Sequence, residues 1–249
     1  KLTIEDPNLV IKIDEESGET IMAGMGGLHL DVAVNLIKDA KVEIVTSEPL
    51  INYRETINGG CEPVMAKSPN RHNKIFMKVE PLEPEIAEMC RNGTLSEMKD
   101  KKETSQILRD KGWSPDVAKK VMKFDSRGNI MINGTKGVQF VDESTDSLLS
   151  GFDEVMSEGG LTKEQVRNCK FTFTHFVPHE DTAHRGLSQI GPASRRACLA
   201  AFLSAEPVLL EPMLAIEVRV PTDLIGNVSS VLQGKRGKVL DMQQKGATS

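Results

Sequence analysis

The sequence has no long hydrophobic run, and this absence excludes several protein classes. Among its 249 residues, no stretch approaches the roughly 20 consecutive apolar residues that a membrane-spanning helix needs, and no signal peptide stands at the start. The first residue is Lys1 and not methionine, so we expect the chain to be a fragment of a longer protein. These features favour a soluble protein of the cytoplasm.

Aromatic residues and cysteines are also scarce. Only 4% of the residues are aromatic, which argues against a stand-alone RNA-binding module that stacks bases on aromatic rings. The four cysteines are Cys61, Cys90, Cys169 and Cys198. They lie far apart and form no Cys-x-x-Cys pair, so neither a zinc site nor a disulfide framework is indicated. We expect buried, reduced thiols.

The composition is that of a globular chain, with 39% hydrophobic and 27% charged residues. A net charge of −5 argues against a generally cationic nucleic-acid binder. The basic residues nevertheless cluster, at Lys67, Arg71 and Lys74, at Arg185, Arg195 and Arg196, and at Lys235, Arg236 and Lys238. An acidic body with local basic clusters is able to contact phosphates, while the rest of its surface resists indiscriminate binding.

Hydrophobic periodicity and turn residues predict an α+β fold. Strands are expected over 9–13, 20–23, 42–45, 61–66, 75–79, 130–132, 171–177, 214–220 and 238–242. Helices are expected over 28–37, 84–91, 96–110, 115–123, 142–158, 188–205 and 222–234. A turn around Ser17-Gly18, a hairpin loop over 68–73 and a linker over 207–212 connect them. The glycines at 24–27 lack a phosphate-loop motif and indicate a tight turn between strand and helix.

The most informative stretch is the polar loop that follows the strand predicted over 171–177. It reads His179-Glu180-Asp181-Thr182-Ala183-His184-Arg185-Gly186. In the zinc-binding motif His-Glu-x-x-His the second histidine comes four residues after the first, whereas His184 comes five after His179. Five residues at about 100° each leave the two imidazoles roughly 140° apart on a helix, so the motif fails. A hydrolase using His179, Glu180 and His184 also lacks a nucleophile, and we predict no catalytic residue and no metal site. From these residues alone, a solvated loop is the alternative.

Two loops resemble those of a known family. The run from His179 to Gly186, followed by Gln189, Pro192 and Arg195-Arg196, resembles the tip of domain IV in archaeal and eukaryotic elongation factor 2, the ribosomal translocase and counterpart of bacterial elongation factor G. The loop Ser68-Pro69-Asn70-Arg71-His72-Asn73 is similar to a second loop at the same tip. The runs 23–30, 50–57, 135–139 and 208–249 resemble other parts of the family in the same order.

The resemblance implies a multidomain α+β fragment. Residues 1–56 would form a partial, ferredoxin-like domain III, and residues 57–207 the tip domain IV, with a fold like domain 2 of ribosomal protein S5. Residues 208–249 would form a partial, ferredoxin-like domain V.

The resemblance also implies a function, which is GTP-dependent translocation of transfer RNA and messenger RNA through the ribosome. GTP and Mg²⁺ would bind an N-terminal domain outside this chain, so this fragment is expected to be no enzyme and to hold no cofactor. Its tip would enter the decoding region of the small subunit and contact ribosomal RNA. A stand-alone RNA-binding module and a drifted paralogue of the translocase are the alternatives.

Individual residues take roles from the same resemblance. His184 stands where the family carries diphthamide, which implies diphthamide-synthesis enzymes and diphtheria-type ADP-ribosylating toxins as partners. The residues expected to contact RNA or the ribosome are His179, Arg185, Gly186, Asn70, Arg71, His72 and Asn73. Glu180 and Asp181 would repel phosphate, so we predict that they face inward, accept loop N–H groups or pair with Arg185, and hold His184 outward. The family's small residues or proline after Arg-Gly are replaced here by Leu187-Ser188.

Overall fold

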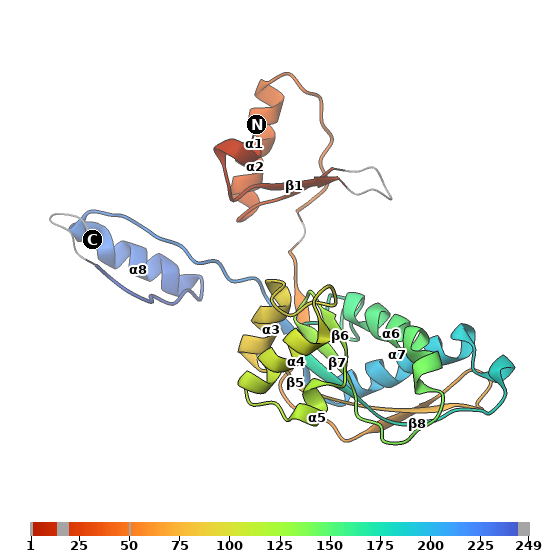
Figure 1. Cartoon of the computed structure of the whole chain (residues 1–249). Coiled ribbons are helices and arrows are strands. Elements are labelled where there is room, and N and C mark those ends of the chain that lie inside the picture. Colours follow the sequence, from red (N-terminus) through yellow and green to blue (C-terminus); the bar gives the residue numbers. More distant parts are fainter. Residues whose placement is uncertain (1, 14–19, 50, 244–249) are drawn as a thin grey trace. The chain divides into compact units, whose positions relative to one another are not determined.

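A computed structural model describes residues 2–13, 20–49 and 51–243. The chain divides into two compact units, one of residues 50–212 and one that combines residues 1–49 with 213–249 (Figure 1). The turn predicted at Ser17-Gly18 lies outside the described residues. Within the described part, no helix is both long and apolar enough to cross a membrane.

A five-stranded sheet forms the body of the central unit. Its strands are β4 (Val64–Lys67), β5 (Lys74–Pro81), β6 (Val121–Asp125), β7 (Asn129–Asn133) and β8 (Cys169–Val177), in the spatial order β4-β5-β8-β7-β6. β7 and β8 are parallel, and the other neighbours are antiparallel. Along β8, Phe171 and Phe173 are buried while Thr172 and Thr174 are half-buried, which confirms the predicted alternation.

Helices cover both faces of the sheet. The long helices α6 (Val141–Ser157) and α7 (Leu187–Leu203) pack on each other and on one face, where Phe152, Phe171 and Phe202 form part of the main core. A second core gathers the short helices α3 (Pro84–Arg91), α4 (Lys101–Asp110) and α5 (Pro115–Ala118). In β7, Met131 belongs to the main core, and Ile130 and Ile132 belong to the second, so this strand is buried on both faces.

The two ends of the central unit are joined by strand pairing. β3 (Arg54–Ile57) pairs antiparallel with β9 (Pro207–Leu210). The linker predicted over 207–212 is therefore wrong for its first four residues. Its partner strand lies about 150 residues away in the sequence, and local patterns carry no information about such a pairing.

Other local expectations fail for the same reason. Within the described residues, the alternating segments 42–45, 214–220 and 238–242 form no strand and pair with no other strand. The helix predicted over 115–123 ends at Ala118, since the residues from Val121 onward pair with β7 instead. Alternation alone thus does not make a strand.

The other unit has few elements of its own. At the chain start, α1 (Leu2–Glu5) is followed by the hairpin of β1 (Val10–Ile13) and β2 (Thr20–Ala23) and by α2 (Gly27–Asp39). His29 fixes the turn before α2, with its Nδ1 accepting from the Met25 N–H at 3.0 Å and its Nε2 2.6 Å from Asp6 Oδ2. The C-terminal segment contains the short turn η2 (Thr222–Leu224) and α8 (Ile225–Gly234).

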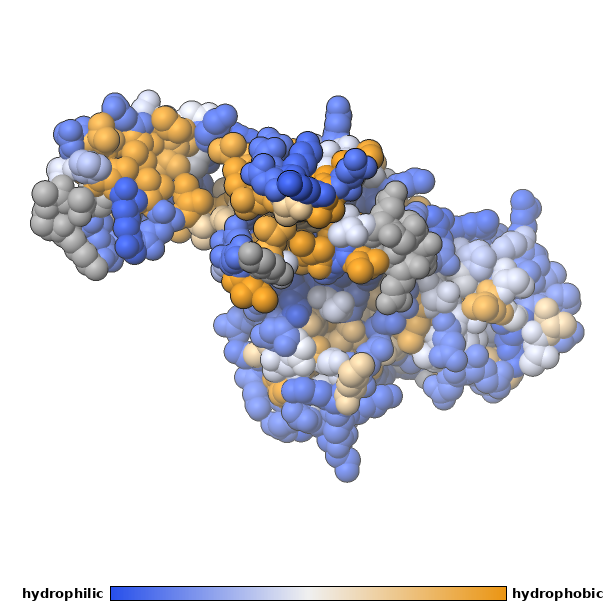
Figure 2. All heavy atoms as spheres, turned by 90° about the horizontal axis from the view of Figure 1, so that it is seen from above, coloured by the Kyte–Doolittle hydropathy of each residue, from blue (hydrophilic) through white to orange (hydrophobic). Residues whose placement is uncertain are grey.

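This second unit exposes much of its apolar surface. The stripe predicted on the first helix has Leu28 80% and Leu36 51% exposed, with Ala33 buried. On α8 and beyond, Val231 and Leu240 are 65% and 91% exposed. Figure 2 shows hydrophobic side chains gathered on the segments at both chain ends, while the visible face of the central unit is mainly hydrophilic. The central unit is thus the part of the chain whose large apolar side chains are mostly buried in a core.

Replacing Gly151 with alanine should destabilise the central unit by about 2 kcal/mol, because overpacking a tight contact typically has an effect of this size. A Cβ at Gly151 on α6 would lie 2.5 Å from both the Arg195 N and the Gly191 O of α7. These are main-chain atoms, so the helices must move apart. The free energy of unfolding is measured in denaturant through the fluorescence of Trp113, the chain's one tryptophan. Ser150→Ala is the control, and equal midpoints for both variants would contradict the prediction.

The four cysteines are free, and three of them, Cys90, Cys169 and Cys198, are buried. Burial raises the pKa of each of these three thiols to about 12. At mildly alkaline pH, a thiol reagent should therefore modify at most Cys61 in the folded protein and all four cysteines after denaturation. Rapid modification of three or more thiols in the folded protein would contradict this burial.

The same thiols make the stability depend on pH. Because the folded state keeps protons that the unfolded state releases from about pH 9, the free energy of unfolding should fall as the pH rises from 9 toward 12.

Candidate nucleic-acid interface

Two loops meet at one end of the central sheet. Residues 68–73 connect β4 to β5, and residues 178–186 connect β8 to α7. β5 and β8 are antiparallel neighbours, and Lys74 at the start of β5 pairs with Val177 at the end of β8. The loop before one strand and the loop after the other therefore leave the sheet at the same end. The sequence predicts this convergence only through the family resemblance.

Asn73 connects the two loops through its side chain. It is fully buried, and its Nδ2 donates to Ser68 Oγ at 3.0 Å and to the His184 main-chain O at 2.7 Å. Its Oδ1 accepts from the His179 N–H at 2.9 Å. Both polar atoms of this buried amide are thus bonded within the protein, to residues 106 and 111 positions away in the sequence. This corrects the expectation that the Asn73 side chain contacts RNA.

Asn70 and Gln189 make a second connection between the loops. The Asn70 Nδ2 donates to the His184 O at 2.9 Å, and the Asn70 N–H donates to Gln189 Oε1 at 3.0 Å. The carbonyl of His184 therefore receives amide hydrogen bonds from both Asn70 and Asn73. The main chain of His184 is fixed from within, while its ring remains half-exposed.

Three histidines from the two loops form a cluster, which we call the imidazole cluster (His72, His179 and His184). The ring centroids lie 5.0 Å apart for His72 and His179, 5.1 Å for His72 and His184, and 4.7 Å for His179 and His184. The rings are tilted or edge-on to one another. Among the described residues, no group of three or more His, Cys, Asp or Glu is arranged to hold a metal ion. The cluster presents flat polar rings to solvent at the loop junction.

Arg185 is buried beneath the cluster and not on the surface, and this corrects the expectation that its side chain contacts RNA or the ribosome. It is 8% exposed, and its Nη1 donates to the main-chain O of His179 at 3.1 Å and of Glu180 at 2.6 Å. Its Nη2 lies 2.7 Å from Glu143 Oε2, and its guanidinium lies 3.7 Å from the centre of the Phe140 ring. A buried guanidinium with these partners holds the loop against α6. Local sequence patterns carry no signal for Glu143 or Phe140 as partners of Arg185, because both are over 40 residues away in the sequence.

The two acidic residues of the loop have different roles. Asp181 precedes the short turn η1 (Thr182–His184), and its Oδ1 accepts from the Ala183 N–H at 2.9 Å, which is the contact expected of these carboxylates. Glu180 contributes its main-chain O to Arg185. Both Glu180 and Asp181 are exposed, so the prediction that they face inward is wrong. Neither carboxylate pairs with Arg185, whose partner is Glu143. Gly186 is the residue before α7, and its O accepts from the N–H groups of Gln189 and Ile190.

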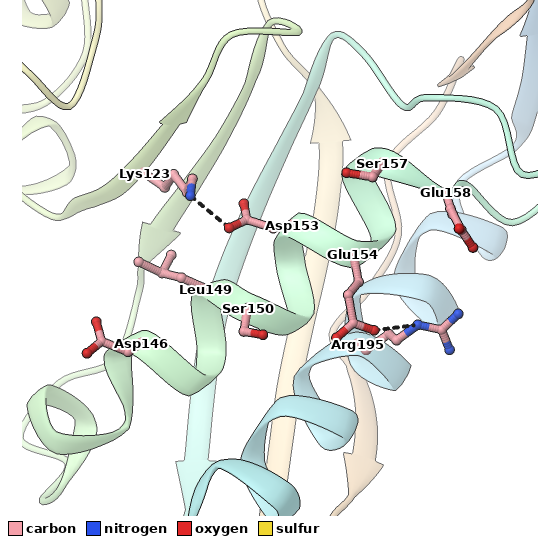
Figure 3. A pocket seen from close by; sticks show the side chains of 9 residues that line it. All are labelled: Lys123, Asp146, Leu149, Ser150, Asp153, Glu154, Ser157, Glu158 and Arg195. Carbon is pink, nitrogen blue, oxygen red and sulfur yellow. Dashed lines mark hydrogen bonds and ion pairs between the residues drawn. The ribbon is translucent and has the colours of Figure 1, made fainter. Parts of the chain in front are cut away.

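A separate cavity of about 660 Å³ lies between α6, β6 and α7. Figure 3 shows its two cations directed at carboxylates, with Lys123 2.8 Å from Asp153 and Arg195 3.1 Å from Glu154. Burial lowers the pKa of Lys123, but the bond to Asp153 and the nearby carboxylate charges outweigh it, so this pKa is raised and the ammonium stays charged. Asp146 and Glu158 add further negative charge. This acidic cavity therefore does not favour an anionic ligand.

Comparison with known proteins assigns three successive segments of the chain to one family. Models of elongation factor G match the chain in order, with domain III over residues 1–48, domain IV over 93–206 and the C-terminus over 208–249. The elongation factor 2 of Cenarchaeum symbiosum is 72% identical over 249 residues, which is all of this chain. The chain belongs to the elongation factor 2 and elongation factor G family. The resemblance drawn from the two loops is thereby confirmed.

Other members of the elongation factor 2 family are also similar. Those of Sulfurisphaera tokodaii and Metallosphaera sedula are each 46% identical, over 99% and 100% of this chain. The chain spans about a third of the length of these relatives, 34% in each case. The match to domain IV includes the loop of His179 and His184, and the α+β architecture expected for this family is confirmed.

Proposed function

We propose that this chain supplies the domain IV tip of a ribosomal translocase, in which the two loops contact RNA in the decoding region of the small subunit. The observation that carries the proposal is the junction of the loops through Asn73, which places the imidazole cluster at one end of the domain. The relatives that match the whole chain are named elongation factor 2. A translocase acts on transfer RNA and messenger RNA together, in the cytoplasm.

The chemistry of the tip suits recognition of RNA shape. Half-exposed imidazoles and the exposed Arg71 offer hydrogen-bond donors and flat surfaces to phosphates, 2′-hydroxyls and base edges. Contacts to backbone and shape carry no sequence information, and a factor that accepts every codon requires this property. The buried Arg185 and the Asn73 amide keep the loops in place, so little ordering is required on binding.

His184 is the residue that we propose to be modified to diphthamide. Its carbonyl is held by Asn70 and Asn73, while its ring remains half-exposed at the end of the domain. This geometry supports access by diphthamide-synthesis enzymes and by ADP-ribosylating toxins. We further propose that the chain itself catalyses no reaction, and that GTP and Mg²⁺ bind elsewhere in the full-length factor.

A chimera tests this function. The 249 residues replace the matching third of the Cenarchaeum symbiosum factor, and single-turnover translocation is measured on archaeal ribosomes. We expect the chimera to translocate at close to the rate of the unaltered relative. A chimera that hydrolyses GTP on the ribosome but does not translocate would favour a drifted paralogue. Salt-sensitive binding of the isolated chain to free RNA, without ribosome binding, would favour a stand-alone RNA-binding module.

A further inference from the structure

A cationic groove lies beside the tip, between the edge strand β4 and helix α7. Its volume is about 550 Å³. Its floor includes Met65, Ala66 and Ala200, and its cations are Lys67, Arg71 and Arg196. Lys67 and Arg71 come from the first tip loop and the strand before it, whereas Arg196 comes from α7. The fold therefore unites basic residues from two separate clusters in the sequence.

The lining of the groove is positively charged. No Asp or Glu is among the residues that line it. All three cations are exposed, and within the described ranges none of them lies within 4.0 Å of a carboxylate oxygen. The acidic cavity differs on this point, because its Lys123 and Arg195 are both paired with carboxylates. Unpaired cations facing one groove favour a polyanionic ligand.

Main-chain atoms help to position two of these cations, Arg71 and Arg196. Arg71 has a φ of 63°, and its N–H donates to the Ser68 O at 2.8 Å. The main chain of the loop therefore has a fixed, tight turn at the residue that carries this guanidinium. The Arg196 Nη1 lies 3.5 Å from the Lys67 O. Among the described strands, β5 is the one neighbour of β4, so the outer edge of β4 also has main-chain N–H groups that no described strand pairs. The groove is thus a built surface and continues the tip through Ser68 and Arg71.

We propose that this groove binds the phosphate backbone of an RNA strand that continues past the tip. The guanidinium groups of Arg71 and Arg196 match phosphate geometry, and the small apolar floor accommodates ribose. The inference rests on the proposed function, since it assigns a second contact for the same RNA partner. Binding there positions the tip without reading sequence.

The test uses the chimera and its affinity for ribosomes as a function of salt concentration. Lys67→Glu combined with Arg196→Glu should weaken binding at least tenfold and reduce the slope of log affinity against log salt by about one unit for each lost phosphate contact. Lys101→Glu combined with Lys102→Glu on α4 is the matched control, because both lysines are exposed and α4 packs in the second core, on the sheet face opposite α7. This control should bind like the unaltered chimera.

The outcomes separate the groove from the proposed function. If the unaltered chimera binds ribosomes and both double variants bind equally well, or are weakened equally, the groove proposal is overturned and the tip function stands. If the unaltered chimera does not bind, the proposed function fails and the groove proposal with it. A photoreactive benzoylphenylalanine at Met65, which is 44% exposed, should cross-link to ribosomal RNA. Cross-linking to a ribosomal protein instead would overturn the choice of ligand.

Discussion

Replacing Asn73 with alanine should reduce translocation by the chimera about 100-fold while the central sheet remains folded. The substitution removes both the donors to Ser68 Oγ and the His184 O and the acceptor of the His179 N–H. Each buried group left without a partner costs about 1–3 kcal/mol, so we expect about 3 kcal/mol against the joined state of the loops. At about 1.4 kcal/mol for each factor of ten, this corresponds to roughly a hundredfold loss of the competent tip.

Two further variants separate this effect from general instability. Asn73→Asp keeps the acceptor but loses the amide donors, so its translocation rate should be intermediate. Asn58 is exposed and lies outside both tip loops, so Asn58→Ala should leave the rate unchanged. Hydrogen exchange should show faster exchange of the N–H groups of residues 179–186 in Asn73→Ala alone. Normal translocation by Asn73→Ala would mean that the loops need no such junction.

Glu55 should be among the most sensitive positions for stability, and Glu55→Ala should lower the free energy of unfolding by about 4 kcal/mol. Its side chain is fully buried in β3, and its carboxylate accepts from the N–H groups of Leu161, Thr162 and Glu164 at 2.9, 2.8 and 3.1 Å. These bonds hold the connection between α6 and β8. Alanine would leave three main-chain donors without their acceptor, and bonds to a charged acceptor are the stronger kind.

Denaturant unfolding followed by Trp113 fluorescence measures this loss. Glu55→Gln retains one acceptor oxygen but directs an NH₂ group at N–H donors, so its loss should lie between those of the unaltered chain and Glu55→Ala. Glu62→Ala is the matched control, because Glu62 is exposed in the same unit. Its effect should stay within about 0.5 kcal/mol. A similarly small effect for Glu55→Ala would show that the three N–H groups find other partners.

The elements predicted best from the sequence are long ones in which apolar residues repeat with a regular period. The helix from Val141 to Ser157 and the strand from Cys169 to Val177 lie within one or two residues of their expected bounds, because their apolar residues repeat with one clear period. The residues of β9 have the local pattern of a linker, since only the pairing with β3 makes them a strand. The alternating run 214–220 has the pattern of a strand but pairs with no strand among the described residues. Partners distant in sequence decide both cases.

Contacts between residues far apart in the sequence also decide the candidate site. The resemblance identified both loops, but the junction through Asn73 and the support of Arg185 by Glu143 connect residues 42 or more positions apart. The fold places the three arginines of one basic cluster in the sequence, Arg185, Arg195 and Arg196, at different sites. Arg185 is buried, Arg195 pairs with Glu154, and Arg196 faces the cationic groove. Successive residues on a helix point about 100° apart, which explains why Arg195 and Arg196 reach different surfaces.

The most direct test of the proposed function is the structure of the chimera bound to an archaeal ribosome, determined by electron cryomicroscopy with a non-hydrolysable GTP analogue. We predict that residues 68–73 and 179–186 lie together against RNA of the decoding region, with the ring of His184 at the contact. Loops that are separated from each other, or a joined tip that lies in solvent away from the small subunit, would contradict the proposal.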